Sequence, residues 1–310
     1  PWHLFDMGTL RGRLSLGVLL LATVPPLFVV AALTDRHVRV SQAAHAMQTN
    51  TTARQLARSV DAYLDSHIAG VRVAAASLGE VPTLDSAAVT RLLERTHRIY
   101  PGFLTLVAAD MSGEVRGATQ RIDGTLRVLA NPVANVAQHP FFTEALRTSG
   151  PYLSPASRSH GLTHEPVVAI SMAVIRGSRT WGVVRGALDL PALRRLEKGT
   201  DEEELQHIVI TDPRGSVVYA SADTGLQSLT DAKRAPLYGA EHPDGTAFRV
   251  KHPLGAGEGD VMAVRVRSAH GWSVVAMMPV TTFGLEFLRR LNDALPWLAL
   301  SVLGGALLAR

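Results

Sequence analysis

Residues 103–119 read FLTLVAADMSGEVRGAT, and residues 207–222 read HIVITDPRGSVVYASA. Each stretch is an apolar run, followed by Asp-x-x-Gly and then by a second β-rich run. In such a turn the Asp side chain initiates the reversal, and the Gly adopts a positive φ at no steric cost. Both stretches are therefore predicted to be β-hairpins.

The order of segments around the hairpins repeats. A further strand is predicted after each hairpin, where residues 181–190 read WGVVRGALDL and residues 271–280 read GWSVVAMMPV. A short helix at residues 139–146, opened by Pro140, falls inside the first copy. Further strands are predicted there at residues 151–158 and 166–175. The matched order and spacing favour an internal duplication of an α+β module, with about 100 residues in each copy.

Two more helices are predicted beside the first copy. Asp85 is placed as the N-cap of a short helix at residues 85–100. Residues 191–197, with Pro191 at the first position, are expected to form the helix that connects the two copies.

A long helix is predicted ahead of both copies. Residues 35–78 lack proline and contain one glycine, Gly70, which favours a helix along their whole length. Its apolar stripe includes Leu56, Val60, Tyr63, Val71, Ala74 and Leu78. We expect this stripe to pack against the folded domain of the same chain and not against a second subunit. A thinner stripe of Ala43, Ala44 and Met47 predicts contact with a second subunit in a homodimer.

Two uncharged runs bracket the chain. Residues 14–33 match the hydrocarbon thickness of a bilayer, and Arg11 and Arg13 precede them, as expected of a cytoplasmic N-terminus. Residues 294–309 form the second run. The sequence thus predicts a protein of the bacterial inner membrane, with the region between the runs in the periplasm or extracellular space. The alternatives are a cleaved signal peptide for the first run and a buried soluble helix for the second.

Composition and motifs exclude several classes of function. The chain has no cysteine, which removes thiol nucleophiles, thiolate zinc sites and disulfides. Its net charge of +4 is spread over 31 basic and 27 acidic residues, so we expect no nucleic acid partner. It has no nucleophile elbow, phosphate loop or dinucleotide fingerprint, so we expect no catalytic residue and no cofactor. His160 and His164 have i, i+4 spacing, but Gly161 disfavours a helix there, and we expect no metal site.

Five stretches together carry a family resemblance. They are YPGFLTLVAADMSGEV (100–115), HPFFTEAL (139–146), PYLSP (151–155), VVAISMAV (167–174) and WGVVRGALDL (181–190). In this order the chain resembles the double Cache sensor domains of bacterial chemoreceptors, sensor histidine kinases and diguanylate cyclases. The resemblance covers residues 35 to about 290. It implies two PAS-like modules, the first distal and the second proximal to the membrane.

The predicted fold class is α+β, with a long N-terminal helix followed by two PAS-like antiparallel-sheet modules and flanked by transmembrane helices. The predicted segments are a cytoplasmic N-terminus (1–13), transmembrane helix 1 (14–34), a stalk helix (35–80), the distal module (81–198), the proximal module (199–281), an exit helix (282–293) and the start of transmembrane helix 2 (294–310).

The resemblance also identifies where this chain departs from the family. In amino-acid-binding members, an Arg-x-Trp-Tyr element holds the ligand carboxylate, and an Asp on the last strand of the distal module binds the amine. Here residues 139–142 read HPFF where that element would lie. Ala187 stands in place of the amine-binding Asp, with Asp189 two residues on and expected on the same strand face. These departures argue against an α-amino acid ligand.

PAS-like sheets hold a ligand between the sheet and the helix and loop that cover it. Arg158 and Arg185 suit a carboxylate because guanidinium groups bind it through paired hydrogen bonds. His139 would make affinity depend on pH near neutrality. Phe141 and Phe142 are interpreted either as pocket walls or as core. The candidate ligand-binding residues are His139, Phe141, Phe142, Tyr152, Ser154, Arg158, Ser171, Arg185 and Asp189.

The predicted function is sensing across a membrane. A small anionic organic molecule binds the distal module, and the resulting helix displacement reaches a cytoplasmic kinase, cyclase or chemotaxis module beyond Arg310. The chain itself is expected to perform no chemistry. Two alternatives remain: a module that binds a periplasmic protein without a small-molecule ligand, and a membrane-anchored hydrolase.

Overall fold

The computed structural model describes most of the 310 residues. The chain divides into two compact units, residues 48–278 and residues 1–47 with 279–310. The described backbone covers residues 10–81, 85–129, 135–159, 165–193, 207–221, 224–238, 242–251 and 260–280, with helical pieces at 287–289, 291–293, 296 and 299.

Helix α1 (Leu10–Glu80) contains the predicted long helix at residues 35–78. Within the described part of the chain, no helix is both long enough and apolar enough to cross a bilayer. Many side chains of residues 14–33, and most of residues 294–310, lie outside the described residues. The α+β class, with a long N-terminal helix and antiparallel sheets, is confirmed.

The first module, as we call the larger sheet with α2 and α3, contains six antiparallel strands in the order β3-β2-β1-β8-β7-β4. The strands are β1 (Phe103–Asp110), β2 (Val115–Ile122), β3 (Thr125–Val128), β4 (Tyr152–Leu153), β7 (Ala169–Arg176) and β8 (Arg179–Leu188). Helix α2 (Ser86–Ile99) begins after Asp85, whose side chain accepts a hydrogen bond of 2.6 Å from the Ala88 amide. This N-cap was predicted from the sequence.

Two of the expected strands are divided. The predicted strand at 151–158 forms β4 and β5 (Ser157–Arg158), because Pro155 has no amide to donate to a ladder. The predicted strand at 166–175 forms β6 (Pro166–Val167) and β7. The helix expected at 191–197 begins as the 3₁₀ turn η2 (Leu190–Leu193), and its remainder lies outside the described residues.

The second module, as we call the smaller sheet with its 3₁₀ turns, has the strand order β10-β9-β13-β12-β11. Its elements are β9 (His207–Thr211), β10 (Val217–Ala220), η4 (Ala232–Arg234), η5 (Pro236–Tyr238), β11 (Ala247–Lys251), β12 (Asp260–Arg267) and β13 (Ser273–Pro279). Ala232 and Leu237, from the two 3₁₀ turns, pack against one face of the sheet with Val209, Phe248 and Val275.

Both predicted hairpins are confirmed, and their turns share one geometry. The Oδ1 atom of Asp110 accepts hydrogen bonds from the Ser112 and Glu114 amides. The Oδ1 atom of Asp212 accepts from the Arg214 and Ser216 amides, both at 2.9 Å. Gly113 and Gly215 have positive φ values of 79° and 87°, which residues other than glycine rarely adopt.

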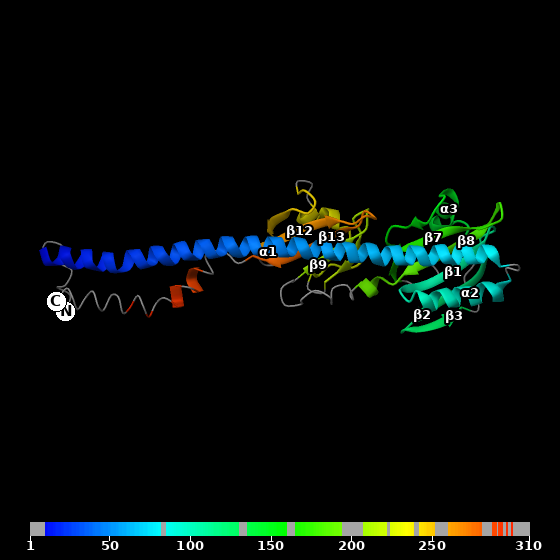
Figure 1. Ribbon diagram of the computed structural model, residues 1–310, viewed down its shortest axis with the longest axis horizontal. Coiled ribbons are helices and arrows are strands. Elements are labelled where there is room, and N and C mark those ends of the chain that lie inside the picture. Colours follow the sequence, from blue (N-terminus) through cyan, green and yellow to red (C-terminus); the bar gives the residue numbers. More distant parts are fainter. Residues whose placement is uncertain are drawn as a thin grey trace. The chain divides into compact units, whose positions relative to one another are not determined.

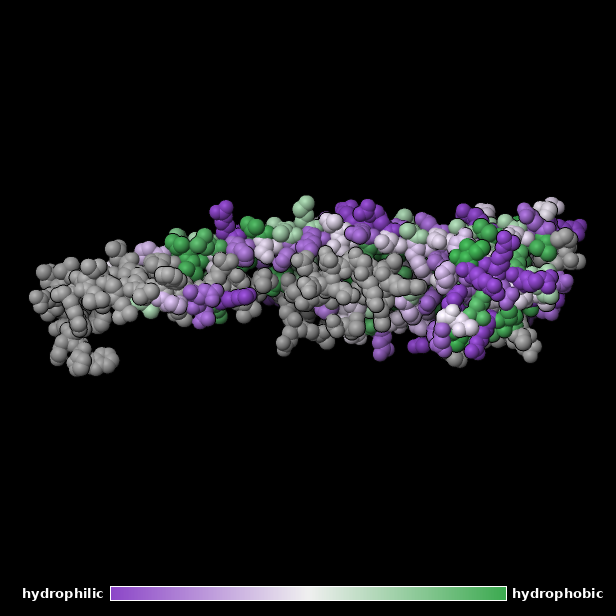
Figure 2. All heavy atoms as spheres, turned by 60° about the horizontal axis from the view of Figure 1, so that its bottom comes forward, coloured by the Kyte–Doolittle hydropathy of each residue, from purple (hydrophilic) through white to green (hydrophobic). Residues whose placement is uncertain are grey.

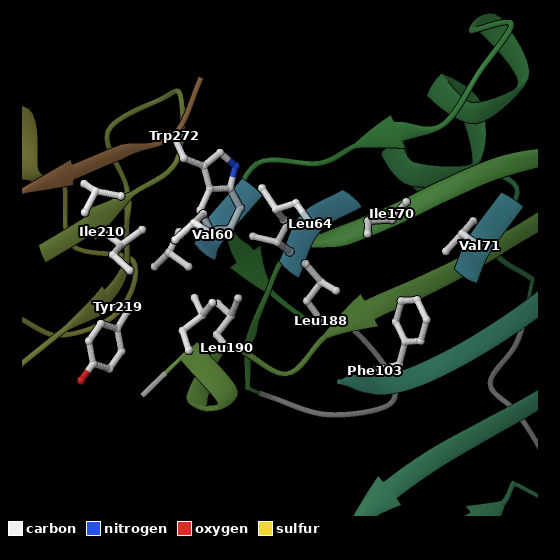
Figure 3. Close-up of a cluster of buried hydrophobic side chains, with 14 of the residues drawn as sticks. Val60, Leu64, Val71, Phe103, Ile170, Leu188, Leu190, Ile210, Tyr219 and Trp272 are labelled. Carbon is white, nitrogen blue, oxygen red and sulfur yellow. The ribbon is translucent and has the colours of Figure 1, made fainter. Parts of the chain in front are cut away.

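One hydrophobic core joins α1 to both sheets. Figure 3 shows Val60 and Leu64 of α1 among Leu188 of the first module and Ile210 and Trp272 of the second. Further along the helix, Val71 packs in the same cluster as Phe103 and Ile170. In Figure 1, α1 runs past β9 and β13 and then past β7, β8 and β1. The apolar stripe read from the sequence is therefore shared between the two modules.

Hydrogen bonds fix α1 to each module in addition to the core. The carboxylate of Asp61 accepts from the Ala269 and His270 amides in the turn before β13. The carboxylate of Asp65 lies 2.8 Å from His270 Nε2. The Tyr63 hydroxyl lies within 3.2 Å of two carbonyls of the first module, those of Gly102 and Asp189.

His97 is a buried polar residue that links α2 to two strands of the first module by hydrogen bonds. Its Nε2 lies 2.7 Å from the Phe103 carbonyl and its Nδ1 lies 2.9 Å from the Thr119 hydroxyl. A carbonyl only accepts, so Nε2 carries the proton and Nδ1 accepts from Thr119. Burial lowers the pKa of His97 to about 4, against a smaller opposing effect of the bond to Phe103.

Replacing Leu64 by alanine is expected to lower the free energy of unfolding by about 2–5 kcal/mol, because it opens a cavity at a fully buried position between the sheets. Urea unfolding of the purified chain measures this change. Val73→Ala is the matched control on the same helix: Val73 is 49% exposed, so a loss below about 0.5 kcal/mol is expected. Similar losses in both variants would contradict a core shared through Leu64.

Acidification is expected to destabilise the fold through His97. Its pKa is depressed in the folded state, so the unfolded chain binds the proton more tightly between pH 6.5 and about 4. Lowering the pH from 7 to 4.5 should therefore cost about 2 kcal/mol at this residue. Urea unfolding of wild type and His97→Gln at both pH values measures the difference. An unchanged pH dependence in the variant would contradict this assignment.

Candidate ligand site

A cavity of about 410 Å³ lies on the face of the first module's sheet that is turned away from α1. Alternation along the strands sets the two faces. Leu106 and Val184 belong to the core shared with α1, whereas their neighbours Val107 and Arg185 line the cavity. Helix α3 (Pro140–Arg147) and the segment 152–159 form its other walls.

Sheet register brings the key polar side chains into one row. Arg185 on β8 is paired with Val107 on β1 and with Ser171 on β7. Ser171 is in turn paired with Tyr152 on β4. The row therefore runs across four strands and ends in the cavity wall formed by Tyr152.

Arg185 is a buried cation without a counter-ion among the described residues. Its side chain is only 8% exposed, and its Nε atom has no hydrogen-bond partner in the described part of the chain. Burial lowers the pKa of Arg185 to about 10. The guanidinium carbon lies 4.9 Å from the centre of the Phe141 ring, and this cation–π contact compensates only part of the desolvation. Such a group is available to pair with an anion that enters the cavity.

Helix α3 covers the cavity and is held to the sheet by a side chain. Ser171 donates a hydrogen bond of 2.9 Å to the Phe141 carbonyl. His139 is the N-cap residue, and its ring stacks on Phe141 with centroids 5.7 Å apart. Phe141 therefore contacts both the His139 ring and the Arg185 guanidinium. The opposite side of α3 packs into a small core through Phe142 and Ala145.

The segment 152–159 forms the polar side of the cavity. The Ser154 hydroxyl accepts a hydrogen bond from the Ala169 amide on β7 and donates one to the Pro155 carbonyl. These bonds fix the segment against the sheet. Arg158, on β5, adds a second guanidinium to the lining.

Six of the nine predicted site residues line the cavity: His139, Phe141, Tyr152, Ser154, Arg158 and Arg185. The other three have different places. Phe142, 3% exposed, packs in the core beside Ala109 and Val183. Ser171 supports α3 from beneath the cavity. Asp189 follows the end of β8, and its amide and carbonyl bond to Gly102 and Tyr63.

Sequence reasoning missed one charged residue of the site. Arg214 lines the cavity but belongs to the β9–β10 turn of the second module. No local signal could have found it, because its place depends on how the two sheets pack along α1. With Arg158 and Arg185 it brings the lining to three arginines, and no Asp or Glu is among the described lining residues. The described lining can therefore neutralise an anion, and it contains no carboxylate for a ligand ammonium.

The long N-terminal helix and the two antiparallel sheets along it are shared with double Cache ligand-binding domains of bacterial chemoreceptors, which confirms the predicted resemblance in fold. The valine complex of the ligand-binding domain of the Campylobacter jejuni chemoreceptor Tlp3 is similar, with a TM-score of 0.61 and 14% identity. The match covers 80% of this chain and 96% of that domain.

Two Pseudomonas chemoreceptor domains are similar as well. The ligand-binding domain of the P. aeruginosa amino acid chemoreceptor PctC, in complex with GABA, gives a TM-score of 0.58 at 15% identity, over 75% of this chain and 99% of that domain. The P. fluorescens CtaA domain with L-alanine gives 0.56 at 16% identity, over 75% and 94%. A scan against family models and a search of curated proteins found no match.

Replacing Arg185 by methionine is expected to stabilise the ligand-free chain by about 1–3 kcal/mol, because an apolar side chain of similar length removes an unpaired buried charge. Thermal unfolding without added ligand measures the change. Arg179→Met, at the exposed start of β8, is the matched control and should leave the melting temperature nearly unchanged. A lower melting temperature for Arg185→Met would show that the guanidinium is paired inside the protein.

Proposed function

We propose that this chain is the extracytoplasmic ligand-sensing region of a transmembrane receptor, and that its cavity binds a small carboxylate. The observation that carries the proposal is Arg185, a buried guanidinium with an unsatisfied Nε in a cavity without acidic residues among its described lining. A bidentate carboxylate would restore the hydrogen bonds and the charge balance that the fold leaves open. The similar chemoreceptor domains carry amino acids or GABA, which supports a small-molecule ligand.

An anion without an amino group fits the cavity better than an α-amino acid. The two aspartates of the hairpin turns are already engaged, since Asp110 pairs with Arg116 and Asp212 accepts three backbone amides. Asp189 is not among the residues that line the cavity. A ligand ammonium would therefore meet three arginines and lose its own hydration without a compensating charge.

Helix α1 is the element through which we propose that the signal leaves the module. It shares a core with both sheets, so a shift of the first sheet must either move the helix or break that packing. The proposal includes transmembrane helices at residues 14–34 and 294–310, a homodimer paired along the membrane-proximal part of α1, and a cytoplasmic output domain. The ligand acts by binding one arrangement of the helix more tightly than the other.

The two alternative functions have less support. A hydrolase needs a nucleophile beside a base, and Ser154 in the cavity is already bonded to Ala169 and Pro155. A large exposed apolar patch would favour a protein-binding module. On the face in Figure 2, hydrophobic and hydrophilic side chains alternate in small groups over the first module.

Three probes with the same four-carbon chain test the proposal: butyrate, succinate and GABA, which differ only at the far end. Isothermal titration calorimetry of the purified chain should detect butyrate and succinate, with GABA bound more weakly. Arg185→Met should weaken both acids about 10- to 100-fold, the loss expected for a charge-assisted hydrogen-bonded pair. Arg179→Met should bind them as wild type does.

Because Arg185→Met is expected to remain folded, lost binding cannot be ascribed to unfolding. Tighter binding of GABA than of both acids, or equal binding by wild type and Arg185→Met, would contradict a carboxylate site at Arg185. If wild type binds none of the three probes, the six-carbon pair hexanoate and adipate is tested in the same way, and failure of all five refutes the proposal.

A further inference from the structure

The turn that carries Arg214 belongs to one module and is bonded to the other. Asp212 Oδ2 accepts a hydrogen bond of 2.9 Å from the Ala156 amide, in the segment that forms the polar side of the cavity. The other oxygen of the same carboxylate holds the turn itself through the Arg214 and Ser216 amides. Asp212 is 2% exposed, so water does not compete for these bonds.

Hydrogen bonds and packing of neighbouring residues hold the backbone at Arg214 in one conformation. The Gly215 amide donates to the Asp212 carbonyl at 2.9 Å, and the positive φ of Gly215 closes the turn. The aliphatic part of Lys233 packs directly over Gly215. Arg214, an exposed residue, thus lines the cavity from a turn of the second module that its own hydrogen bonds hold in place.

Two of the three arginines among the described lining residues therefore come from different modules. Arg185 is supplied by β8, in the sheet of the first module. Arg214 is supplied by the second module, next to the Ala156 amide. A ligand with two anionic groups can pair each of them with its own guanidinium in the bidentate geometry.

We propose that Arg214 is a ligand-binding residue which recognises a second anionic group, so that the bound ligand bridges the two modules. This inference rests on the proposed function of the cavity and deepens it. The ligand class is then a dicarboxylate or a similar dianion. Such a ligand gains its second ion pair only while the Asp212 turn is docked on Ala156, so it selects the docked arrangement of the modules.

The ratio of succinate to butyrate affinity isolates the contribution of Arg214. The two probes share a four-carbon chain and one carboxylate, and only succinate has a second. Isothermal titration calorimetry should give a succinate preference of at least ten-fold in wild type and less than three-fold in Arg214→Met. The affinity for butyrate should stay within about two-fold of wild type. Arg234→Met is the matched control, since Arg234 lies on η4 of the same module and is absent from the cavity lining.

The outcomes separate this inference from the proposed function. If Arg185→Met loses both probes while Arg214→Met keeps the wild-type succinate preference, the cavity binds carboxylates and the bridging role of Arg214 is wrong. If neither arginine affects either probe, the cavity itself is wrongly assigned. A wild type that binds succinate no better than butyrate also overturns the bridging role.

Hydrogen–deuterium exchange gives a readout that a purely structural role of Arg214 would not change. Succinate should slow exchange at residues 212–216 and 156–159 of wild type, because the ligand holds the turn on the first module. Butyrate should protect only the first module. In Arg214→Met, succinate should behave as butyrate does, and protection of residues 212–216 by succinate in that variant would contradict the proposal.

Discussion

Everything described in this protein depends on the burial of one face of α1 against two sheets at once. Val60 and Leu64 are fully buried where the sheets approach each other, and α1 contributes buried residues to the shared core from Ala53 to Leu78. A methylene removed from water contributes about 0.8 kcal/mol, so this face contributes a large share of the hydrophobic stabilisation. The helix cannot leave one sheet without exposing side chains that also stabilise the other.

The face of the first sheet that is turned away from α1 lines the cavity. There the cavity contains the Arg185 guanidinium, whose Nε has no hydrogen-bond partner among the residues that the structure describes, and burial lowers the pKa of Arg185 to about 10. A protein optimised for stability alone would have an apolar side chain at this position, because an unpaired buried charge lowers the free energy of unfolding. The two faces of one sheet therefore differ: one packs on α1, and the other lines a cavity that contains a buried guanidinium.

The sequence predicted the features that local chemistry determines. The hairpins follow from Asp-x-x-Gly, α2 from its Asp85 cap and α3 from Pro140 at its first turn. Arg185 could be proposed from residue type and strand position. Arg214 could not be found, because nothing near it in the chain shows that its turn docks on Ala156. Phe142 had two interpretations, which only the packing of α3 on the sheet distinguishes.

The two Asp-x-x-Gly turns have the same hydrogen bonds except at one oxygen of the aspartate. In each, Oδ1 of the aspartate fixes the reversal, and Oδ2 remains available. In the first turn that spare oxygen accepts from Arg116 of its own hairpin, and in the second it accepts from Ala156 of the neighbouring module. The hairpin turn forms with either partner of Oδ2. That partner can therefore change while the hydrogen bonds within the turn stay the same. Two copies of one motif can thus acquire different roles, one local and one architectural.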